Sequence, residues 1–532
     1  MKLQDQLILC HFNEKVLSLW ADLYNKNNIE ASFLLQLFTE KLTRRGKKIF
    51  FSFETDNLIK NVFLKNLTDT NKEELAFNKE AVLLYDLFHK NKIESITFFD
   101  SFNPFWDTDV YDNMLQIHNE YSADYTFCEN TPDGITPVLF NSSIFDAYKL
   151  LFSKENDSYT ETELKAALQS MPFSFKQYLE KNLNQYHVEI HFEFPDIRML
   201  RLDFSCSTLR SFHMCNNFVK ELKGQSQLST PYKNLKEIIQ SKPEIIYEQP
   251  SYIEIEPYSG CSYQCTFCPR TVTDKAPIHK LALADFITID NFCKTLYGDT
   301  VITLGGNGEP LEHPEIIHIL EFLLQSPHVR YTILETNGYF LEKLHDLCSN
   351  SYFEKLRIVI NINSLEHYEK IHGTNKESRE KVFNNLISWN RILKNKNTDL
   401  LKNTYIQMLK ILDNETEVDG IYNLSETHGF TFLLQKYNSY NGQMEEKRVS
   451  DMTPLERSFC WHLRRDLFIR ADGNISFCKQ DILNKKPRGN IRTNDIAFMI
   501  ENQKKDWIDN YLEKYPSEPA CIKCDEYFTF NL

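Results

Sequence analysis

The stretch IEIEPYSGCSYQCTFCPRT, residues 253–271, places three cysteines within eight positions directly behind an alternating apolar run. The run predicts a β-strand, so Cys261, Cys265 and Cys268 belong to the loop that follows it. Gaps of three and two residues span only about 10 Å even when extended, so these thiolates can reach three corners of one [4Fe-4S] cube. The next cysteine, Cys293, lies in a helical pattern, which leaves one iron open to a ligand or substrate.

The composition is that of a folded protein with several domains. The chain has 532 residues, 42% of them hydrophobic and 25% charged. A formal net charge of -14, with dispersed Lys and Arg, gives no general attraction to nucleic acid or to an anionic membrane. No apolar run approaches the roughly 18 residues of a membrane helix, and the N-terminus lacks a signal-peptide pattern. We therefore expect a cytoplasmic protein that binds neither nucleic acid nor membrane.

The thirteen cysteines fall into two groups by spacing. Six stand alone in apolar or helical surroundings, where a cysteine acts as a small buried hydrophobic residue. These are Cys10, Cys128, Cys206, Cys215, Cys293 and Cys348. The remaining seven are candidate metal ligands, namely Cys261, Cys265, Cys268, Cys460, Cys478, Cys521 and Cys524.

Strand-like and helix-like runs alternate from residue 251 onward. Strands are predicted at SYIEIEP, TVITLGG, VRYTILETN, LRIVININ, NTYIQMLKI and TFLLQKY, and residues 313–326 have helical spacing. Parallel neighbours need crossover helices, so six such units predict an α/β fold whose parallel sheet curls into a partial (β/α)6 barrel. We expect an α/β domain over 1–230, a linker over 231–250, the barrel over 251–441 and a small cysteine-bearing domain over 442–532.

On these residues the chain resembles the radical SAM superfamily, whose CxxxCxxC signature carries an aromatic residue before the last Cys, here Phe267. GGNGEP, at 305–310, is similar to the family's GGEP element, in which the acidic residue binds the amino group of S-adenosylmethionine (SAM). The third predicted strand ends in TNG, at 336–338, as in the family. The fourth has Asn361 where the family often carries a Ser. The resemblance implies SAM contacts at Phe267, Gly305, Gly306, Gly308, Glu309, Pro310, Asn337, Asn361 and Ser364.

Four cysteines form a second candidate site near the C-terminus. Cys460 and Cys478 flank a predicted hairpin with a DGN turn, and Cys521 and Cys524 form a CxxC pair. By spacing alone, zinc or an iron-sulfur cluster satisfies four thiolates. The segment resembles the SPASM/twitch extension of radical SAM enzymes, which implies one auxiliary [4Fe-4S] cluster acting as an electron relay or acceptor. The charged residues Arg464, Arg465 and Asp466 either face the active site or, as is more common for such a run, form a solvated strand edge, which is the interpretation we favour.

The first domain resembles the nucleotidyltransferase and glycosyltransferase fold of GT-A type. Asp100 and Asp203 follow strand-like runs and would suit a metal ion. The stretch LILCHFNEKVLSLW has no glycine, so the phosphate-binding loop of such enzymes is missing and a degenerate binding domain is expected. Taken whole, the chain resembles the family called spiro-SPASM.

The resemblance implies a radical SAM enzyme with a SAM-binding [4Fe-4S] cluster and an auxiliary one. We expect it to take electrons from a reductant such as flavodoxin or ferredoxin and to act on a peptide, a protein or a nucleotide-linked sugar. The alternatives are a transferase with structural metal-binding cysteines, a non-catalytic electron carrier, and a zinc site in which His279 joins the three clustered cysteines.

Overall fold

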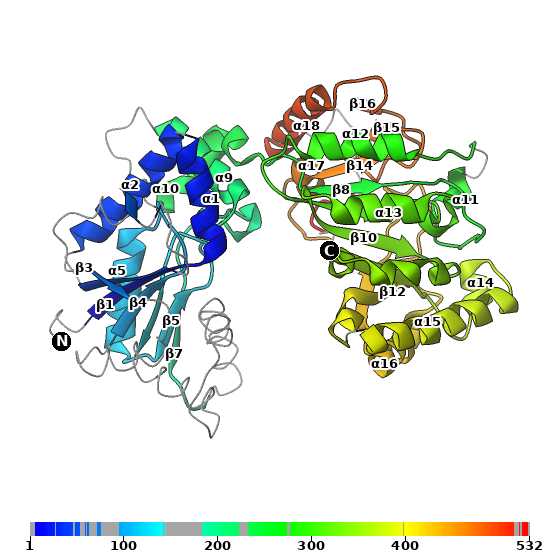
Figure 1. Ribbon diagram of the computed structural model, residues 1–532, viewed down its shortest axis with the longest axis horizontal. Helices are drawn as coiled ribbons and strands as arrows, with labels where there is room; N and C mark the ends of the chain where they lie inside the picture. Colours follow the sequence, from blue (N-terminus) through cyan, green and yellow to red (C-terminus); the bar gives the residue numbers. More distant parts are fainter. Residues whose placement is uncertain are drawn as a thin grey trace. The chain divides into compact units, whose positions relative to one another are not determined.

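In the computed structural model, the chain forms two compact units, Met1–Ile246 and Tyr247–Leu532, which are drawn in Figure 1. It describes all residues except 1–5, 27, 46–47, 54–58, 60, 63–71, 76–94, 142–143, 145–183, 223–231, 274–276, 397, 515–520, 522–523 and 530–532.

The first unit is built on a seven-stranded sheet with the order β3-β2-β1-β4-β6-β5-β7. β6 runs antiparallel to both of its neighbours, and the other pairs are parallel. The strands are β1 (Gln6–Phe12), β2 (Lys48–Phe53), β3 (Lys72–Leu75), β4 (Ser95–Phe99), β5 (Tyr125–Cys128), β6 (Val138–Asn141) and β7 (Val188–His191). The helices are α1 (Glu14–Asn25), α2 (Ile29–Arg44), α5 (Thr108–Glu120), α9 (Leu209–Leu222) and α10 (Tyr232–Ser241). The unit is therefore an α/β fold with one reversed strand.

Part of the stretch expected as a linker is helical. Helix α10 and the 3-10 turn η4 (Pro243–Ile246) lie inside residues 231–250 and belong to the first unit. The backbone N–H of Tyr232 donates to Asp107 Oδ2 at 2.6 Å, which attaches the start of α10 to the start of α5. The predicted boundaries of the functional domains stay a prediction.

The second unit contains a nine-stranded sheet with the order β13-β12-β11-β10-β9-β8-β14-β15-β16. The strands are β8 (Tyr252–Ile255), β9 (Thr300–Leu304), β10 (Val329–Thr336), β11 (Leu356–Asn361), β12 (Thr404–Lys410), β13 (Thr431–Lys436), β14 (Asp466–Ile469), β15 (Asn474–Ser476) and β16 (Gly489–Asn490). β8 to β13 are parallel and lie in sequence order, at the six places where the sequence predicts strands. β14 adds to β8 in parallel and pairs with β15 as the predicted hairpin.

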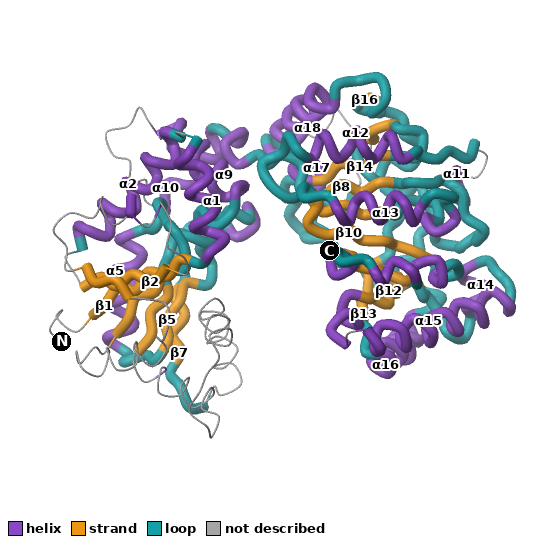
Figure 2. The backbone as a smooth tube through the Cα atoms, in the orientation of Figure 1, coloured by secondary structure: helices purple, strands orange, loops and turns teal. Residues whose placement is uncertain are grey.

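Helices connect the parallel strands and appear beside the sheet in Figure 2. They are α12 (Leu283–Cys293), α13 (Ile316–Gln325), α15 (Lys376–Lys396) and α16 (Val418–His428), with the shorter α11 (Arg270–Thr273), α14 (Tyr368–His372) and α17 (Trp461–Arg465), and with α18 (Ile496–Tyr511) near the C-terminus. None of the helices in the described part of the chain combines the length and the hydropathy that crossing a membrane requires.

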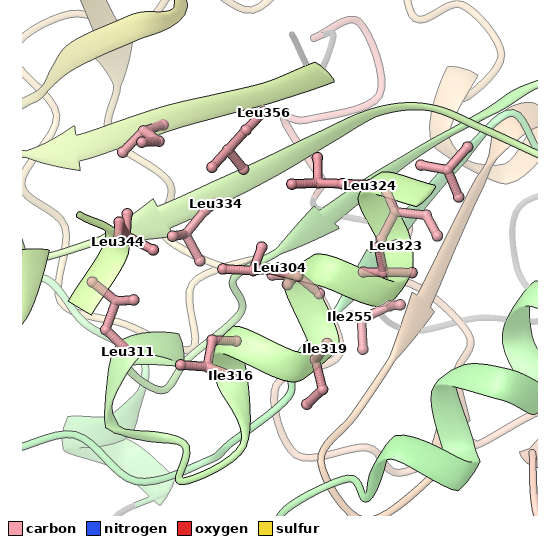
Figure 3. Packing of buried hydrophobic residues seen from close by; sticks show 14 of the residues in the cluster. Ile255, Leu304, Leu311, Ile316, Ile319, Leu323, Leu324, Leu334, Leu344 and Leu356 are labelled. Carbon is pink, nitrogen blue, oxygen red and sulfur yellow. The ribbon is translucent and has the colours of Figure 1, made fainter. Parts of the chain in front are cut away.

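The two faces of the parallel sheet have different neighbours. Figure 3 shows Ile255, Leu304 and Leu334, from three adjacent strands, packing against Ile319 and Leu323 of α13. Successive strand residues point to opposite faces, so the residues between these belong to the other side. That side carries a small apolar cluster and, toward the carboxyl ends of the strands, a cavity. The apolar positions therefore fix which side chains reach the cavity.

Candidate functional site

A cavity of about 620 Å³ lies against this second face of the sheet. Its walls come from the loops that follow β8 and β9, from the ends of β10 and β11, from β12 and β13, and from the C-terminal hairpin. Cys261, Cys265 and Cys268 line it together with Cys478, which is 210 residues further along the chain. One cavity thus contains residues from both cysteine groups.

The three-cysteine loop is held by contacts from neighbouring strand ends. Cys265 Sγ lies 3.6 Å from the carbonyl oxygen of His372. Asn337 Nδ2 donates toward Cys261 Sγ at 3.9 Å, and Cys268 Sγ lies 3.9 Å from the carbonyl oxygen of Asn307. The three-cysteine loop therefore faces the glycine-rich element at 305–310 and the TNG element at 336–338, because the carboxyl ends of parallel strands meet at one edge of a sheet.

The thiols of this loop have strongly raised pKa values. Burial, with the nearby Glu309 carboxyl as the next cause, raises the pKa of the Cys261 thiol to about 12. Burial and the two neighbouring thiols raise the pKa of Cys265 well above its ordinary value. Thiols this reluctant to ionise become thiolates when a metal binds them, because a coordinating thiol is deprotonated outright. Three such thiols lining an open cavity fit a cluster with one free coordination position.

The glycine-rich loop lies tightly against the cysteine loop. A Cβ at Gly308 would sit 1.9 Å from the carbonyl oxygen of Tyr258, so only glycine fits there. Gly306 has a φ of +86°, a conformation that other residues rarely adopt. The Glu309 N–H donates to the carbonyl oxygen of Gly260 at 2.8 Å, which joins the two loops directly.

Glu309 is the acidic residue of this loop and is only 3% exposed. Its carboxylate accepts hydrogen bonds from Thr336 Oγ1 at 2.6 Å and from the backbone N–H of Asn337 at 2.8 Å. Burial raises the pKa of Glu309 to about 7, although these hydrogen bonds lower it. A buried carboxyl on a cavity wall is suited to receive an ammonium group, whose charge offsets the cost of ionisation.

Seven of the nine predicted SAM contacts line the cavity. They are Phe267, Gly305, Gly306, Gly308, Glu309, Asn337 and Asn361. Asn361 Oδ1 accepts a hydrogen bond from Gln407 Nε2 at 2.7 Å. The other two have different positions. Pro310 begins the 3-10 turn η5 (Pro310–Glu312), and Ser364 is fully buried, with its Oγ donating to Glu417 Oε1 at 2.7 Å.

The four C-terminal cysteines also lie together. Cys460, Cys478, Cys521 and Cys524 all line a second, much smaller cavity. Burial, with Cys478 and Cys524 as the next causes, raises the pKa of Cys460 well above its ordinary value. Burial raises the pKa of Cys524 to about 12. Mutually close, buried thiols of this kind fit a metal centre closed by four protein ligands.

In neither cysteine group do the side chains surround a single point, as the ligands of one metal ion would. Among the described residues, no three His, Cys, Asp or Glu side chains converge closely enough to hold one metal ion. A cube binds each thiolate through a different iron, so its ligands stand farther apart than those of one ion. The arrangement of the thiols is therefore compatible with cubes at both places.

The expectation of a solvated strand edge at 464–466 is wrong. Arg464 and Arg465 belong to helix α17 and precede the strand. Arg464 is fully buried. Its charge is compensated there, because Nη2 donates to Glu248 Oε1 at 2.6 Å and the guanidinium lies 4.8 Å from the centre of the Trp461 ring. Asp466 begins β14 and lines the large cavity.

The sequence reasoning missed several charged residues on the cavity wall, including Glu254, Glu335 and Lys479. Glu254 lies in β8, Glu335 in β10, and Lys479 directly follows Cys478. The alternation of side chains along a strand could have revealed Glu254, because it lies between Ile253 and Ile255, which face the helices. It follows that Glu254 must face the cavity.

In the first unit, Asp100 follows β4 and is exposed, and Asp203 forms an isolated parallel bridge with Asp133. A single residue, Asn13, separates β1 from α1, and its side chain accepts a hydrogen bond from the Val16 N–H at 3.0 Å. There is thus no room between this strand and helix for a phosphate-binding loop.

Two family models match the second unit. The model of the radical SAM superfamily matches residues 255–417, and that of an iron-sulfur cluster-binding domain called SPASM matches residues 460–525. The first match contains the three-cysteine loop and Glu309. The second begins at Cys460 and ends one residue after Cys524.

Individual relatives are distant. An uncharacterized protein of Treponema pallidum is 24% identical over 369 residues, covering 66% of this chain and 97% of that protein. The molybdenum cofactor biosynthesis protein moc-5 of Caenorhabditis elegans is 21% identical over 333 residues, covering 53% of this chain and 54% of that protein. The crystal structure of Streptococcus suis SuiB bound to precursor peptide SuiA shares 14% identity, with a TM-score of 0.38, covering 57% of this chain and 76% of that one.

Proposed function

We propose that this chain, a member of the radical SAM superfamily with a SPASM domain, abstracts hydrogen from a substrate held in the 620 Å³ cavity. The observation that carries the proposal is the presence of Cys261, Cys265, Cys268 and Glu309 on one cavity wall. A bound, reduced [4Fe-4S] cluster would supply the electron that cleaves SAM to a 5'-deoxyadenosyl radical. Residues 251–441, curled into a partial (β/α)6 barrel, would provide this site.

The chain's own residues bind and orient. The Glu309 carboxylate would receive the SAM amino group, held in place by its hydrogen bonds from Thr336 and Asn337. The loop around Gly308 would let SAM approach the backbone closely, and Asn361 and Phe267 would complete the cofactor pocket. The cavity walls would exclude water and oxygen from the radical, which is the main task of a protein that binds a reactive cofactor.

The C-terminal segment, 442–532, would hold one auxiliary [4Fe-4S] cluster on Cys460, Cys478, Cys521 and Cys524. All four irons would then have a protein ligand, which argues against direct binding of substrate there. Cys478 lines both the large and the small cavity. An electron relay between the substrate and an external acceptor or reductant, such as flavodoxin or ferredoxin, is the role that this position supports.

For the first unit we propose a degenerate nucleotidyltransferase or GT-A-like binding domain, over about 1–230, in a chain of the spiro-SPASM type. The one-residue connection at Asn13 argues against an active transferase, because no backbone loop is left to cradle a triphosphate. A nucleotide-linked sugar, a peptide or a protein remains the proposed substrate class. We place the enzyme in the cytoplasm, where a low-potential reductant is present.

The proposal is tested by reconstituting the protein with iron and sulfide without oxygen, adding dithionite and SAM, and assaying 5'-deoxyadenosine. We expect its formation together with about eight irons per chain. A protein that binds zinc in place of iron and forms no 5'-deoxyadenosine would refute the proposal.

A further inference from the structure

Three charged side chains meet on the cavity wall away from Glu309. Lys479 Nζ lies 2.7 Å from Glu254 Oε1. Glu335, two strands away from Glu254 in the sheet order, interacts electrostatically with the same ammonium group. If all three are ionised, the cluster carries two negative charges and one positive charge.

The carboxylate of Glu335 has acceptor capacity that the described residues do not use. Glu254 is only 2% exposed, and its Oε1 is ion-paired with the Lys479 ammonium at 2.7 Å. Within the described part of the chain, the carboxylate of Glu335 accepts no hydrogen bond, although it lines the cavity. A half-buried carboxylate on a cavity wall without a protein donor can accept hydrogen bonds from a ligand that enters the cavity.

The other charged groups on the cavity wall are already compensated. Lys436 Nζ lies 2.6 Å from Glu526 Oε1. Asp466 receives His462 Nδ1 at 2.6 Å and Arg465 Nε at 2.9 Å. Among the described residues of the wall, no cation is therefore left over for Glu335, and Lys479 is shared between two carboxylates.

Glu335 also stands next to the cofactor loop. A Cβ built on Gly305, the first residue of GGNGEP, would lie 3.2 Å from Glu335 Oε2. A group bound by Glu335 would consequently lie beside the proposed SAM site.

We propose that Glu335, supported by the Glu254–Lys479 pair, binds a primary ammonium group of the substrate and so directs a neighbouring carbon toward the SAM site. The inference rests on the proposed function, because it takes this cavity as the substrate site. An ammonium group has three donors and one positive charge, which match the free acceptor oxygens of Glu335 and the surplus negative charge of the cluster. A substrate carboxylate is disfavoured, because the Lys479 ammonium already faces Glu254 and the remaining groups would repel it. The raised pKa of Glu335, caused by burial, is consistent with a carboxyl that waits for a cation.

The experiment measures the binding of three small probes by ligand-observed NMR. Reconstituted, unreduced protein saturated with SAM, so that Glu309 is occupied, is titrated with n-butylammonium, 1-butanol and butyrate at constant ionic strength. We expect n-butylammonium to bind at least about tenfold more tightly than either other probe, since tenfold corresponds to the 1.4 kcal/mol of one modest charged hydrogen bond. Equal or tighter binding of butyrate, or no preference among the probes, would overturn the inference.

Two variants change the charge of the cluster in opposite directions. Glu335→Gln removes the surplus negative charge and should abolish the preference for n-butylammonium. Glu321→Gln, at a partly exposed glutamate of α13, is the matched control and should bind as the wild type does. Lys479→Ala leaves two uncompensated carboxylates and space for the probe, so it should bind n-butylammonium more tightly than the wild type. Unchanged or weaker binding in Lys479→Ala that retains its iron contradicts the inference, even if Glu335→Gln fails to fold.

Because no reductant is present, the outcome is independent of SAM cleavage. If the ammonium preference appears in a protein that forms no 5'-deoxyadenosine, the proposed reaction fails and the binding site stands. If 5'-deoxyadenosine forms without any ammonium preference, the reverse holds.

Discussion

The two cysteine groups of the second unit differ in how the chain assembles them. Cys261, Cys265 and Cys268 come from one loop after one strand and line a cavity of about 620 Å³. Cys460, Cys478, Cys521 and Cys524 come from three separate places in the chain and line a cavity that is much smaller. Three ligands beside open space and four ligands around a closed space are the arrangements of a catalytic and a structural or electron-transfer centre, respectively.

The two sites also differ in whether the surrounding structure needs a bound metal to pack. The loop site is supported by a sheet whose core is formed by apolar strands and helices, so its scaffold does not need a metal to pack. The C-terminal site joins the end of the chain to α17 and the hairpin, and small segments of this kind commonly need a metal to hold them. We expect loss of the first centre to abolish chemistry and loss of the second to loosen structure.

The largest effect is expected from removing one ligand at each site. Cys265→Ala should lower 5'-deoxyadenosine formation at least about a thousandfold, because it removes a proposed ligand of the catalytic cluster. Cys478→Ala should keep SAM cleavage by dithionite within about tenfold of the wild type, since the loop site is intact. Each variant should retain about four irons per chain. Equal loss of SAM cleavage in both would show that the two sites are not independent.

The next largest effect is expected at the junction of the two loops. Gly308→Ala places a Cβ against the carbonyl oxygen of Tyr258 and forces the loops apart. SAM affinity, measured by calorimetry, should fall about a hundredfold, equivalent to about 3 kcal/mol. The matched control is Gly420→Ala in α16, whose Cβ would meet only the flexible end of Leu365, at 3.3 Å. It should leave SAM affinity unchanged and stabilise the helix by up to about 1 kcal/mol.

The smallest effect is a pH dependence of stability that stems from Glu309. Its folded-state pKa of about 7 exceeds the ordinary value of 4.5, so its protonation stabilises the cluster-free protein at acid pH. This stabilisation is fully present below pH 4.5 and is lost as the pH rises through about 7. From pH 5 to pH 8, Glu309→Gln should therefore gain ~2 kcal/mol in unfolding free energy relative to the wild type. A constant difference between the two proteins across this range, by urea unfolding, would contradict the raised pKa.

Much of the fold follows from local patterns in the sequence. The six parallel strands lie where alternating or continuous apolar runs predict them, because each run must bury one face against the crossover helices. The DGN turn predicts the β14–β15 hairpin through the same logic. The two cysteine groups were recognisable because ligands of one centre in a tight loop or a CxxC pair stay close in any fold.

What failed depended on contacts between distant segments. The burial of Arg464 requires Glu248, which lies 216 residues earlier. Ser364 was expected to contact the cofactor because it follows a strand. Its hydroxyl donates to Glu417, which lies just before helix α16, and its role toward the cofactor stays a prediction. Lys479 could not be placed on the cavity wall without knowing that the hairpin adds to β8. None of these partners is marked by spacing along the chain.

The central claim is that one centre is open to SAM and the other is closed. It is tested most directly by Mössbauer and electron paramagnetic resonance spectra of the oxygen-free protein with and without SAM. We predict two [4Fe-4S] signals, of which only the one missing from Cys265→Ala changes when SAM is added. A single cluster with zinc at the other site, a response of both clusters, or no response to SAM would contradict the account.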